Sequence, residues 1–401
     1  MTGNTPLAPS APGYNRFAAA MIAVGIATFA HLYCVQPLLP LLAESFSLSP
    51  SSSSLSLSVT TLILAVALPL VGPLTERTNR RRVLQIALAG ATLATLASLL
   101  SPSWPLLLIA RAALGIALAA LPANAMALIA EEVDSRALGR LMGLYLAGTV
   151  FGGMSGRVLA GFLADWLGWR GALAGIDLVG LVCLLVFWRC CPTPQGFTPR
   201  RIALRPYLSA LLHHARDPGL RNFALMGGLL MGQFVATYNY LGFRLLAPPF
   251  NLDHKTVGLL FLTYVAGMVG TTVGGRWLDR WGAGRALPLA LALTAAGQAA
   301  LLIDHLVPIA GGVALMTFGF FAAHACLSTL VGRRGGESKS RTVALYLIAY
   351  YIGSSALGAG LGYAWSGFGW SGVAAAALTA IAVSALLLRP ALRPAPAKSD
   401  S

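Results

Sequence analysis

The chain has 401 residues, of which 57% are hydrophobic and only 10% are charged. Soluble proteins average about 25% charged residues, so these few charges cannot cover a water-exposed surface. The composition therefore excludes a cytosolic enzyme, a secreted disulfide-rich domain and a disordered chain. The net charge of +15 would indicate nucleic-acid binding in a soluble protein, so the placement of the basic residues has to decide between nucleic acid and membrane.

Twelve apolar segments follow one another along the chain, each long enough for a helix to cross the hydrocarbon core of a bilayer. They are 17–41, 56–74, 83–101, 106–130, 141–164, 171–188, 222–246, 257–275, 285–303, 307–330, 342–365 and 371–388. They lack the alternation of transmembrane β-strands. We therefore predict an all-α membrane protein of twelve transmembrane helices. The first segment is too long for a cleavable signal peptide, and no basic residue precedes it in 1–15.

The basic residues follow the positive-inside rule if both termini face the cytoplasm. In this orientation 23 of the 28 basic residues lie in cytoplasmic tails and loops, and only Arg170 and Lys255 lie in loops on the opposite side. Arg244 lies near the outer end of a span, and Arg111 and Arg157 lie within spans. Because the bases are dispersed over short loops, we do not expect nucleic-acid binding.

The longest connection, 189–221, is rich in proline, with Pro192, Pro194, Pro199 and Pro206 among them, as is typical of a linker. Its leucines at 204, 208, 211 and 212 share one face of a short amphipathic helix, which we expect on the membrane surface. The predicted organisation is a cytoplasmic tail at 1–16, a six-helix bundle at 17–188, a cytoplasmic linker at 189–221, a second six-helix bundle at 222–388 and a cytoplasmic tail at 389–401.

The two halves carry related sequences at a nearly constant offset. The loop from Gly72 to Arg82 corresponds to the loop from Gly275 to Arg285, 203 positions later. The sequence Gly-Trp-Arg-Gly at 168–171 returns as Gly-Trp-Ser-Gly at 369–372, at an offset of 201. Two six-helix halves repeated in parallel are a transporter architecture.

The first loop reads Gly-Pro-Leu-Thr-Glu-Arg-Thr-Asn-Arg-Arg-Arg from residue 72. It resembles the major facilitator superfamily signature G-x3-D-[RK]-x-G-R-[RK]-[RK], with Glu76 for Asp and Asn79 for Gly. The second copy has both signature residues, Asp279 and Gly282. Arg111 and Gly115 resemble the helix-four signature R-x3-G. The glycines of 148–161 resemble the helix-five signature, a pattern that the family links to antiporters.

Four further segments resemble bacterial YnfM-type inner-membrane transporters, which are grouped with drug and dye efflux as the acriflavine-sensitivity group. They are 32–37, 152–157, 319–324 and 345–355. This resemblance implies proton-coupled export.

The resemblance also implies that the two basic loops form a conformational gate. An acid at the inner end of one helix is attracted to the positive N-terminus of a neighbour, which in the family is helix eleven. Contacts of this kind form in one conformation and break in the other. The gate residues are Gly72, Glu76, Arg77, Arg80, Arg81, Gly275, Asp279, Arg280, Gly282 and Arg285. For the arginines, anchoring of the topology is the alternative.

A row of glycines in the fifth span would let another helix approach closely. Plain packing is one interpretation, and the resemblance implies packing at an interface that seals and reopens. The residues of this packing motif are Gly115, Gly148, Gly152, Gly153, Gly156 and Gly161.

Polar residues inside spans are costly and therefore indicate function. The resemblance places spans one, four, seven and ten around a central cavity. Tyrosines and amides with few fixed charges suit amphipathic or aromatic ligands, including organic cations. The substrate-cavity candidates are Tyr33, Gln36, Gln233, Tyr238, Asn239, Tyr346 and Tyr350. For any single tyrosine, a hydrogen bond to a neighbouring backbone is the alternative.

Arg111, Arg157 and Asp177 are predicted to share one depth below the outer surface, about 8–10 Å. An arginine that approaches or leaves Asp177 would make this carboxyl release or take a proton. A permanent salt bridge is the alternative. His31 and His324 are further proton-coupling candidates, because imidazole titrates near neutral pH; for each, a hydrogen bond between helices is the alternative.

We therefore expect a proton-driven exporter of small amphipathic or aromatic compounds in a bacterial inner membrane. The alternatives are a sugar or metabolite symporter or facilitator, and a receptor or lipid-handling scaffold that transports nothing. We expect a monomer whose partners are a small-molecule substrate, protons and membrane lipid. No enzyme, nucleotide-phosphate or metal motif occurs in the sequence, so we expect no catalysis and no cofactor.

Overall fold

The computed structural model describes residues 7, 13–75, 77–192 and 203–392, and these are almost entirely helical. Each of the twelve predicted segments lies on helix, which confirms the all-α prediction. Eight helices of the described chain are long and apolar enough to cross a membrane. Two of them, α7 and α14, are each bent into two arms, which is consistent with the predicted number of crossings.

The helices of the first half are α1 (Tyr14–Tyr33), α2 (Leu39–Ser45), α3 (Pro50–Thr75), α4 (Arg80–Leu100), α5 (Trp104–Ala119), α6 (Leu121–Glu132) and α7 (Ser135–Cys190). In the linker lies α8 (Leu204–Ala215), the predicted amphipathic helix. The helices of the second half are α9 (Pro218–Leu246), α10 (His254–Leu259), α11 (Tyr264–Trp281), α12 (Ala283–Ala300), α13 (Leu306–Gly335) and α14 (Lys339–Ala391). Three short 3-10 turns are η1 (Gln36–Leu38), η2 (Leu260–Thr263) and η3 (Gly336–Ser338).

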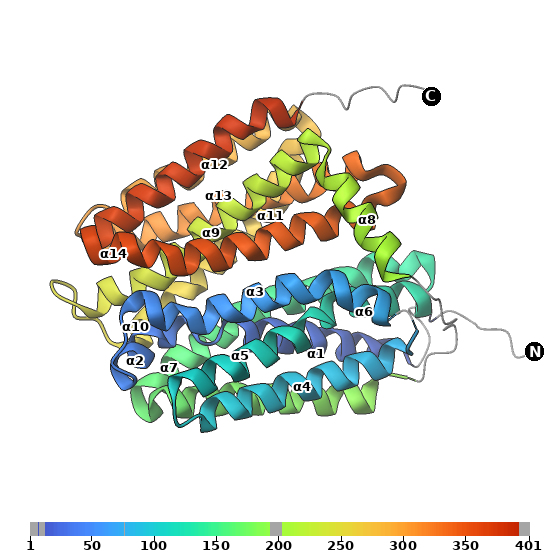
Figure 1. The fold of residues 1–401 in the computed structure, drawn as a ribbon, viewed down its shortest axis with the longest axis horizontal. Coiled ribbons are helices and arrows are strands. Elements are labelled where there is room, and N and C mark those ends of the chain that lie inside the picture. The colour runs from blue at the N-terminus through green and yellow to red at the C-terminus, as the bar shows by residue number, and fades with distance from the viewer. Residues whose placement is uncertain (1–6, 8–12, 76, 193–202, 393–401) are drawn as a thin grey trace, which may run out of the picture.

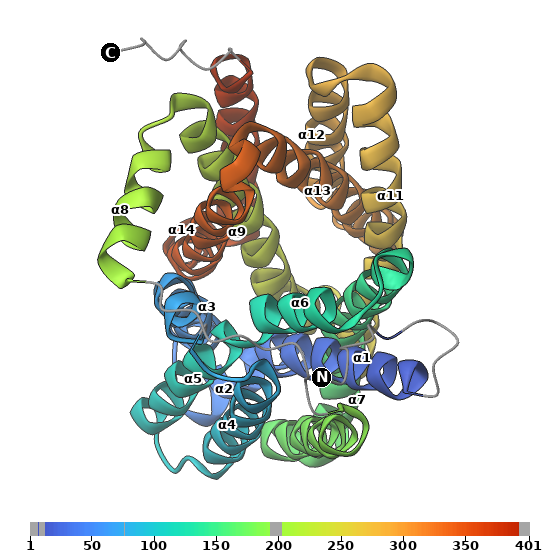
Figure 2. The ribbon, with the colours of Figure 1, turned by 90° about the vertical axis from the view of Figure 1, so that its right-hand side faces the viewer.

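The helices form two bundles. Figure 1 shows α1 to α7 in one bundle, α9 and α11 to α14 in the other, and α8 beside both at one end of the molecule; the short α10 lies at the boundary and packs mainly against α7. Figure 2, seen from that end, shows the same division. Arg16 of α1 donates to the Arg189 carbonyl near the end of α7. The first and last helices of the first bundle therefore begin and end on the same side.

The sequence repeat at 168–171 and 369–372 forms the same bend in both bundles. Gly168 bends α7 with φ of 63°, and Gly369 bends α14 with φ of 60°. Glycine occupies both positions because side chains with a β-carbon rarely adopt this backbone conformation. The following tryptophans fix the bends: the indole of Trp169 donates to Ser45 Oγ at 3.0 Å, and that of Trp370 donates to the Leu301 carbonyl at 2.7 Å.

The outer faces of the helices carry large apolar side chains. Val66, Ile86 and Ile109 are between 54% and 65% exposed, and they represent many others. Extended apolar surfaces of this kind are rare on soluble monomers. Lipid is therefore the solvent that fits these faces.

Candidate functional site

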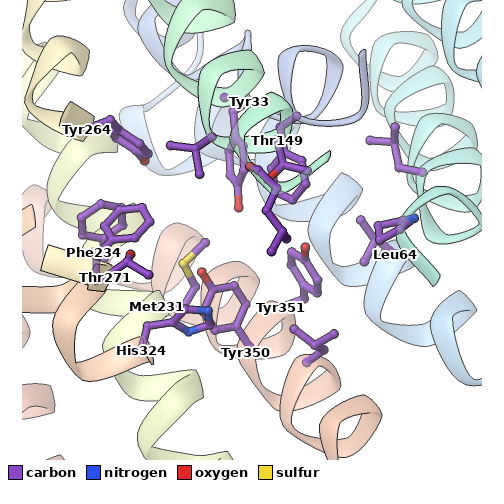
Figure 3. A pocket seen from close by; sticks show the side chains of 18 of the residues that line it. Tyr33, Leu64, Thr149, Met231, Phe234, Tyr264, Thr271, His324, Tyr350 and Tyr351 are labelled. Carbon is purple, nitrogen blue, oxygen red and sulfur yellow. The ribbon is translucent and has the colours of Figure 1, made fainter. Parts of the chain in front are cut away.

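A cavity of about 400 Å³ lies between the two bundles, and both contribute to its wall. Figure 3 shows Tyr33 and Thr149 of the first bundle directed into the same space as Phe234, His324 and Tyr350 of the second. A volume of this size lies within the range of sites that bind small molecules.

The wall from the second bundle is aromatic. Phe234 of α9 and Phe320 of α13 stack with ring centroids 4.0 Å apart. Phe321 meets Phe234 edge to face, at 6.0 Å, and Tyr264 lies 5.8 Å from Phe234. Such a cluster offers flat apolar surface to an aromatic ligand.

His324 is the histidine of the cavity wall. Its Nδ1 lies 2.8 Å from the hydroxyl of Tyr346, and its ring centroid lies 5.0 Å from that of Tyr350. Tyr346 is itself 2% exposed and does not line the cavity. The hydrogen bond to Tyr346 fixes the orientation of the imidazole, because one ring nitrogen is occupied.

Arg157 of α7 brings a guanidinium to the cavity, although only 1% of the residue is exposed. Its Nε donates to Gln36 Oε1 at 2.7 Å, and its Nη1 donates to the Gly153 carbonyl at 2.6 Å. The guanidinium also lies 4.0 Å from the ring centroid of Tyr33 and 4.7 Å from that of Tyr264. Neutral acceptors and aromatic faces thus surround this cation.

One end of the cavity is closed by hydrogen bonds between the bundles. Gln36 donates from Nε2 to Asn239 Oδ1 at 2.8 Å and to the Val235 carbonyl at 3.3 Å. Because Gln36 also accepts from Arg157, a continuous chain of hydrogen bonds joins α7 through η1 to α9.

Further contacts between the bundles lie in the same half of the molecule. Ser355 Oγ donates to the Ser58 carbonyl at 2.7 Å, and Ser51 Oγ donates to the Ala359 carbonyl at 3.1 Å. The Asp165 carboxylate accepts from the backbone amides of His254 and Lys255, at 3.0 and 3.1 Å. This carboxylate thereby caps the N-terminus of α10 in the other half of the chain.

The predicted cavity residues separate into four groups. Tyr33 and Tyr350 line the cavity, Gln36 and Asn239 close its end, and Tyr346 supports His324. The other two candidates lie off the cavity wall. The Tyr238 hydroxyl lies between Thr263 and Thr317, and the buried Gln233 amide has no hydrogen bond within the described chain.

The proton-coupling candidates do not all meet. Buried Arg111 donates to the carbonyls of Ser56, His31 and Leu32, and His31 Nδ1 lies 2.8 Å from Thr95 Oγ1. Neither residue lines the cavity. The Asp177 Oδ1 atom is buried without a hydrogen bond in the described chain.

Among the described residues, no ion pair joins Asp177 to Arg111 or to Arg157. The predicted shared depth therefore does not bring Asp177 into an ion pair with either arginine among the described residues. Depth along three helices leaves their rotation open, and rotation decides which side chains face each other.

The two basic loops differ in how their helices begin. Asn79 has φ of −53° and caps α4 by accepting from the amide of Arg81. Gly282 has φ of 72° between α11 and α12, where glycine is required. This difference explains why Asn79 can replace the signature glycine in the first copy.

Two of the charged gate residues form ion pairs within their own bundles. Arg80 pairs with Glu131 at 2.7 Å, and Asp279 pairs with Arg333 at 2.9 Å. Arg81 donates to the Trp188 carbonyl at 3.3 Å. No ion pair is found in the described chain for Arg77, Arg280 and Arg285. Glu76 lies outside the described residues.

The predicted glycine row packs inside the first bundle. A β-carbon at Gly148 would lie 2.8 Å from the Ile22 carbonyl oxygen, and one at Gly156 would lie 2.8 Å from the Ala30 Cα. At Gly152 it would overlap the backbone of Ile26. The partner of this row is therefore α1 of the same bundle.

The other glycines of the motif have separate partners. Gly161 packs against Gly258 of α10, in the other half of the chain. A β-carbon at Gly161 would lie 2.8 Å from the Gly258 Cα. Gly115 packs against the Thr60 carbonyl of α3, and Gly153 lines the cavity.

Sequence reasoning missed the aromatic wall. Phe234, Phe320 and Phe321 lie in predicted spans, where phenylalanine is expected in any case. Tyr264 could have been predicted as a cavity residue, because a polar tyrosine inside a membrane span indicates a functional position.

The chain is similar to known proteins over most of its length. Residues 20–356 match the sequence profile described as the Major Facilitator Superfamily. The chain is 37% identical over 347 residues to an uncharacterized MFS-type transporter, YybF of Bacillus subtilis (strain 168), covering 86% of each protein. It is also 37% identical to the inner membrane transport protein YnfM of Escherichia coli (strain K12), covering 86% of this chain and 83% of that protein.

Solved structures show the same fold. A bacterial homologue of the human lysosomal transporter Spinster, in an inward-facing and occupied conformation, aligns with a TM-score of 0.78 at 15% identity, covering 95% of this chain and 97% of that one. The nucleoside transporter NupG aligns with a TM-score of 0.80 at 10% identity, covering 94% and 100%. The chain described here belongs to the major facilitator superfamily and is a multi-pass membrane transporter of small molecules, not an enzyme.

Proposed function

We propose that the protein is a proton-driven exporter that moves small amphipathic or aromatic compounds across a bacterial inner membrane by alternating access. The observation that carries this proposal is the aromatic cavity between the two bundles, closed at one end by the hydrogen bonds of Gln36. A cavity shared by two bundles and sealed at one end is what alternating access requires. The protein works as a monomer, because the two bundles of a single chain form both walls of this cavity.

The orientation of the chain gives direction to this cavity. The tails and the linker face the cytoplasm, because the basic loops follow the positive-inside rule. The end closed by Gln36, Ser51 and Asp165 is then the outer end, and the conformation faces the cytoplasm. Export follows when these contacts break and the basic-loop end closes. The gate residues of both loops, Glu76 among them, act at that second step.

The proton carrier in this proposal is His324. Its imidazole lines the same cavity as the ligand, so loading and release of a proton can depend on occupancy. The hydrogen bond to Tyr346 holds the ring in place. Asp177, His31 and Arg111 lie away from the cavity wall and are second candidates.

Reconstituted protein in liposomes tests the proposal. An imposed pH gradient should drive accumulation of aromatic compounds from a panel that includes anionic, neutral and cationic members, and a protonophore should abolish it. Compound added without a gradient should move protons in the opposite direction, as read by an entrapped pH dye. Accumulation with proton movement in the same direction would indicate a symporter. Downhill equilibration that ignores the gradient would indicate a facilitator.

The variant His324→Gln tests whether His324 carries the proton without removing a polar side chain from the cavity wall. Glutamine retains a polar group that can bond to Tyr346 but cannot carry a proton near neutral pH, so accumulation should stop while downhill exchange continues. The matched control is His213→Gln on the exposed face of α8, which should leave accumulation unchanged. Full accumulation by His324→Gln would exclude His324 as the carrier.

A further inference from the structure

The charge of the cavity wall is one-sided. Among the described residues of the wall, Arg157 is the one arginine, and there is no lysine, aspartate or glutamate. The sequence analysis included organic cations among the ligands that would suit this cavity. A cationic ligand in this cavity would meet a like charge and no carboxylate, which is unfavourable at close range.

The hydrogen-bond partners of Arg157 among the described residues are neutral. Its hydrogen bonds go to an amide oxygen of Gln36 and to the Gly153 carbonyl, both neutral. No ion pair of Arg157 is found in the part of the chain that the structure describes. A buried cation is costly unless it is paired. The faces of Tyr33 and Tyr264 offset part of this cost.

The guanidinium has N–H donors left for a ligand. It has five in all, and its hydrogen bonds to Gln36 and Gly153 take one each, from Nε and Nη1. A further side-chain hydrogen bond joins it to Tyr264, which is also a neutral partner. An anionic oxygen at a remaining N–H would accept a charge-assisted hydrogen bond, which is stronger than a neutral one. The stacked rings of Phe234 and Phe320 supply the apolar part of the site, across the same cavity.

We propose that the cavity selects aromatic monoanions, whose anionic group pairs with Arg157 and whose ring system lies against Phe234 and Phe320. This inference rests on the proposed function only in that the cavity is the transport site. Carboxylates and sulfonates share the required chemistry. The volume of about 400 Å³ suits one or two fused rings.

Three probes that share one ring system test the charge selectivity: naphthoate, naphthalenemethanol and naphthylmethylammonium. Their binding to the purified full chain in lipid nanodiscs is measured by equilibrium dialysis, with empty nanodiscs as the background. Naphthoate should bind most tightly and naphthylmethylammonium most weakly. Arg157→Gln should weaken naphthoate by about ten- to a hundredfold, as expected for loss of a charge-assisted hydrogen bond.

Two variants distinguish charge from structure. Arg157→Lys keeps the positive charge and should retain the preference for naphthoate over naphthalenemethanol, which a purely structural role of Arg157 would not predict. Thr149→Asp adds a carboxylate to the cavity wall while Arg157 stays in place. It should weaken the binding of naphthoate and strengthen the binding of naphthylmethylammonium. If Arg157→Gln fails to fold, this variant tests the proposal in its place.

Several results would overturn the inference. They are equal binding of the three probes, tighter binding of the ammonium, no binding of naphthoate at millimolar concentration, and unchanged naphthoate affinity in a folded Arg157→Gln protein. Proton-driven transport of the neutral probe without charge selectivity would overturn this inference and leave the proposed function in place. Selective binding of naphthoate without proton-driven movement would overturn the proposed function alone.

Discussion

Gln36 and Asn239 are separated by 203 positions in the sequence and are joined by a side-chain hydrogen bond of 2.8 Å. The same offset of 203 relates Gly72 of the first basic loop to Gly275 of the second, and we infer that Gln36 and Asn239 occupy equivalent positions in the repeat. Equivalent residues of two repeats meet where the axis that relates the repeats passes between them. Any motion that separates the bundles at this end must break this bond.

Asn239→Ala should therefore shift the protein toward the conformation open at this end. The variant removes the acceptor of Gln36, and a hydrogen bond contributes about 0.5–1.5 kcal/mol, so the ratio of the two conformations should change by about two- to tenfold. Pulsed spin-label distances between Leu167 and Phe368, both exposed beside the two bends, report the change. Thr379→Ala, whose hydroxyl bonds within its own helix at an exposed site, is the control. Identical distance distributions in the two variants would contradict the assignment.

Gly152→Ala should destabilise the first bundle. Its β-carbon would overlap the Ile26 backbone of α1, and overpacking of this kind costs about 1–3 kcal/mol. The matched control is Gly143→Ala on the same helix, where a β-carbon would meet nothing within 4 Å. This control should be neutral or slightly stabilising, because alanine favours helix. Thermal unfolding in detergent measures both, and equal melting temperatures would refute the packing role of Gly152.

Asp217 should stabilise the second bundle in a pH-dependent way. Its carboxylate caps α9 at the Leu220 amide, at 2.8 Å, and pairs with Arg334 at 2.9 Å. Burial alone would raise the pKa of Asp217, but the Leu220 amide and the Arg334 guanidinium together lower it below the ordinary value. A pKa lowered in the folded state means that the contribution is complete above about pH 4 and is lost as the pH falls below it.

Asp217→Asn isolates the ion pair, because asparagine can still cap the helix. It should lower the free energy of unfolding by about 1 kcal/mol at neutral pH, and the difference from wild type should shrink as the pH falls below about 4. Thermal unfolding followed over this pH range gives the result. A difference that stays constant with pH would mean that the charge of Asp217 does not contribute.

The sequence was sufficient for the architecture because helix length and loop charge are local properties. The apolar segments and the linker helix at 204–215 follow from composition and amphipathic spacing. The internal repeat at 168–171 and 369–372 was visible in the sequence, but the bends at Gly168 and Gly369 were not predicted from it. The family resemblance, once the basic loops were compared, was confirmed by the match over residues 20–356.

The site was only partly predictable because a cavity depends on helix rotation and on the bundle opposite. Tyr238 and Tyr350 look alike as tyrosines within spans, yet Tyr350 lines the cavity and Tyr238 bonds to threonines behind it. Arg157 and Asp177 were predicted to share one depth, and the guanidinium of Arg157 contacts Tyr33 of α1 and Gln36 of η1. No local pattern encodes which face of a fully buried helix meets which neighbour.

Locking the closed end tests alternating access most directly. Ser51 of α3 bonds to the Ala359 carbonyl of α14 at 3.1 Å, so Ser51→Cys with Ala359→Cys can be cross-linked there, in a chain whose five native cysteines are replaced. Proton-driven accumulation by this protein in liposomes should stop when the cross-link forms and return when it is reduced, while the single-cysteine variants remain active throughout. Undiminished accumulation by the fully cross-linked protein would contradict the account, because the closed end would then have no need to open.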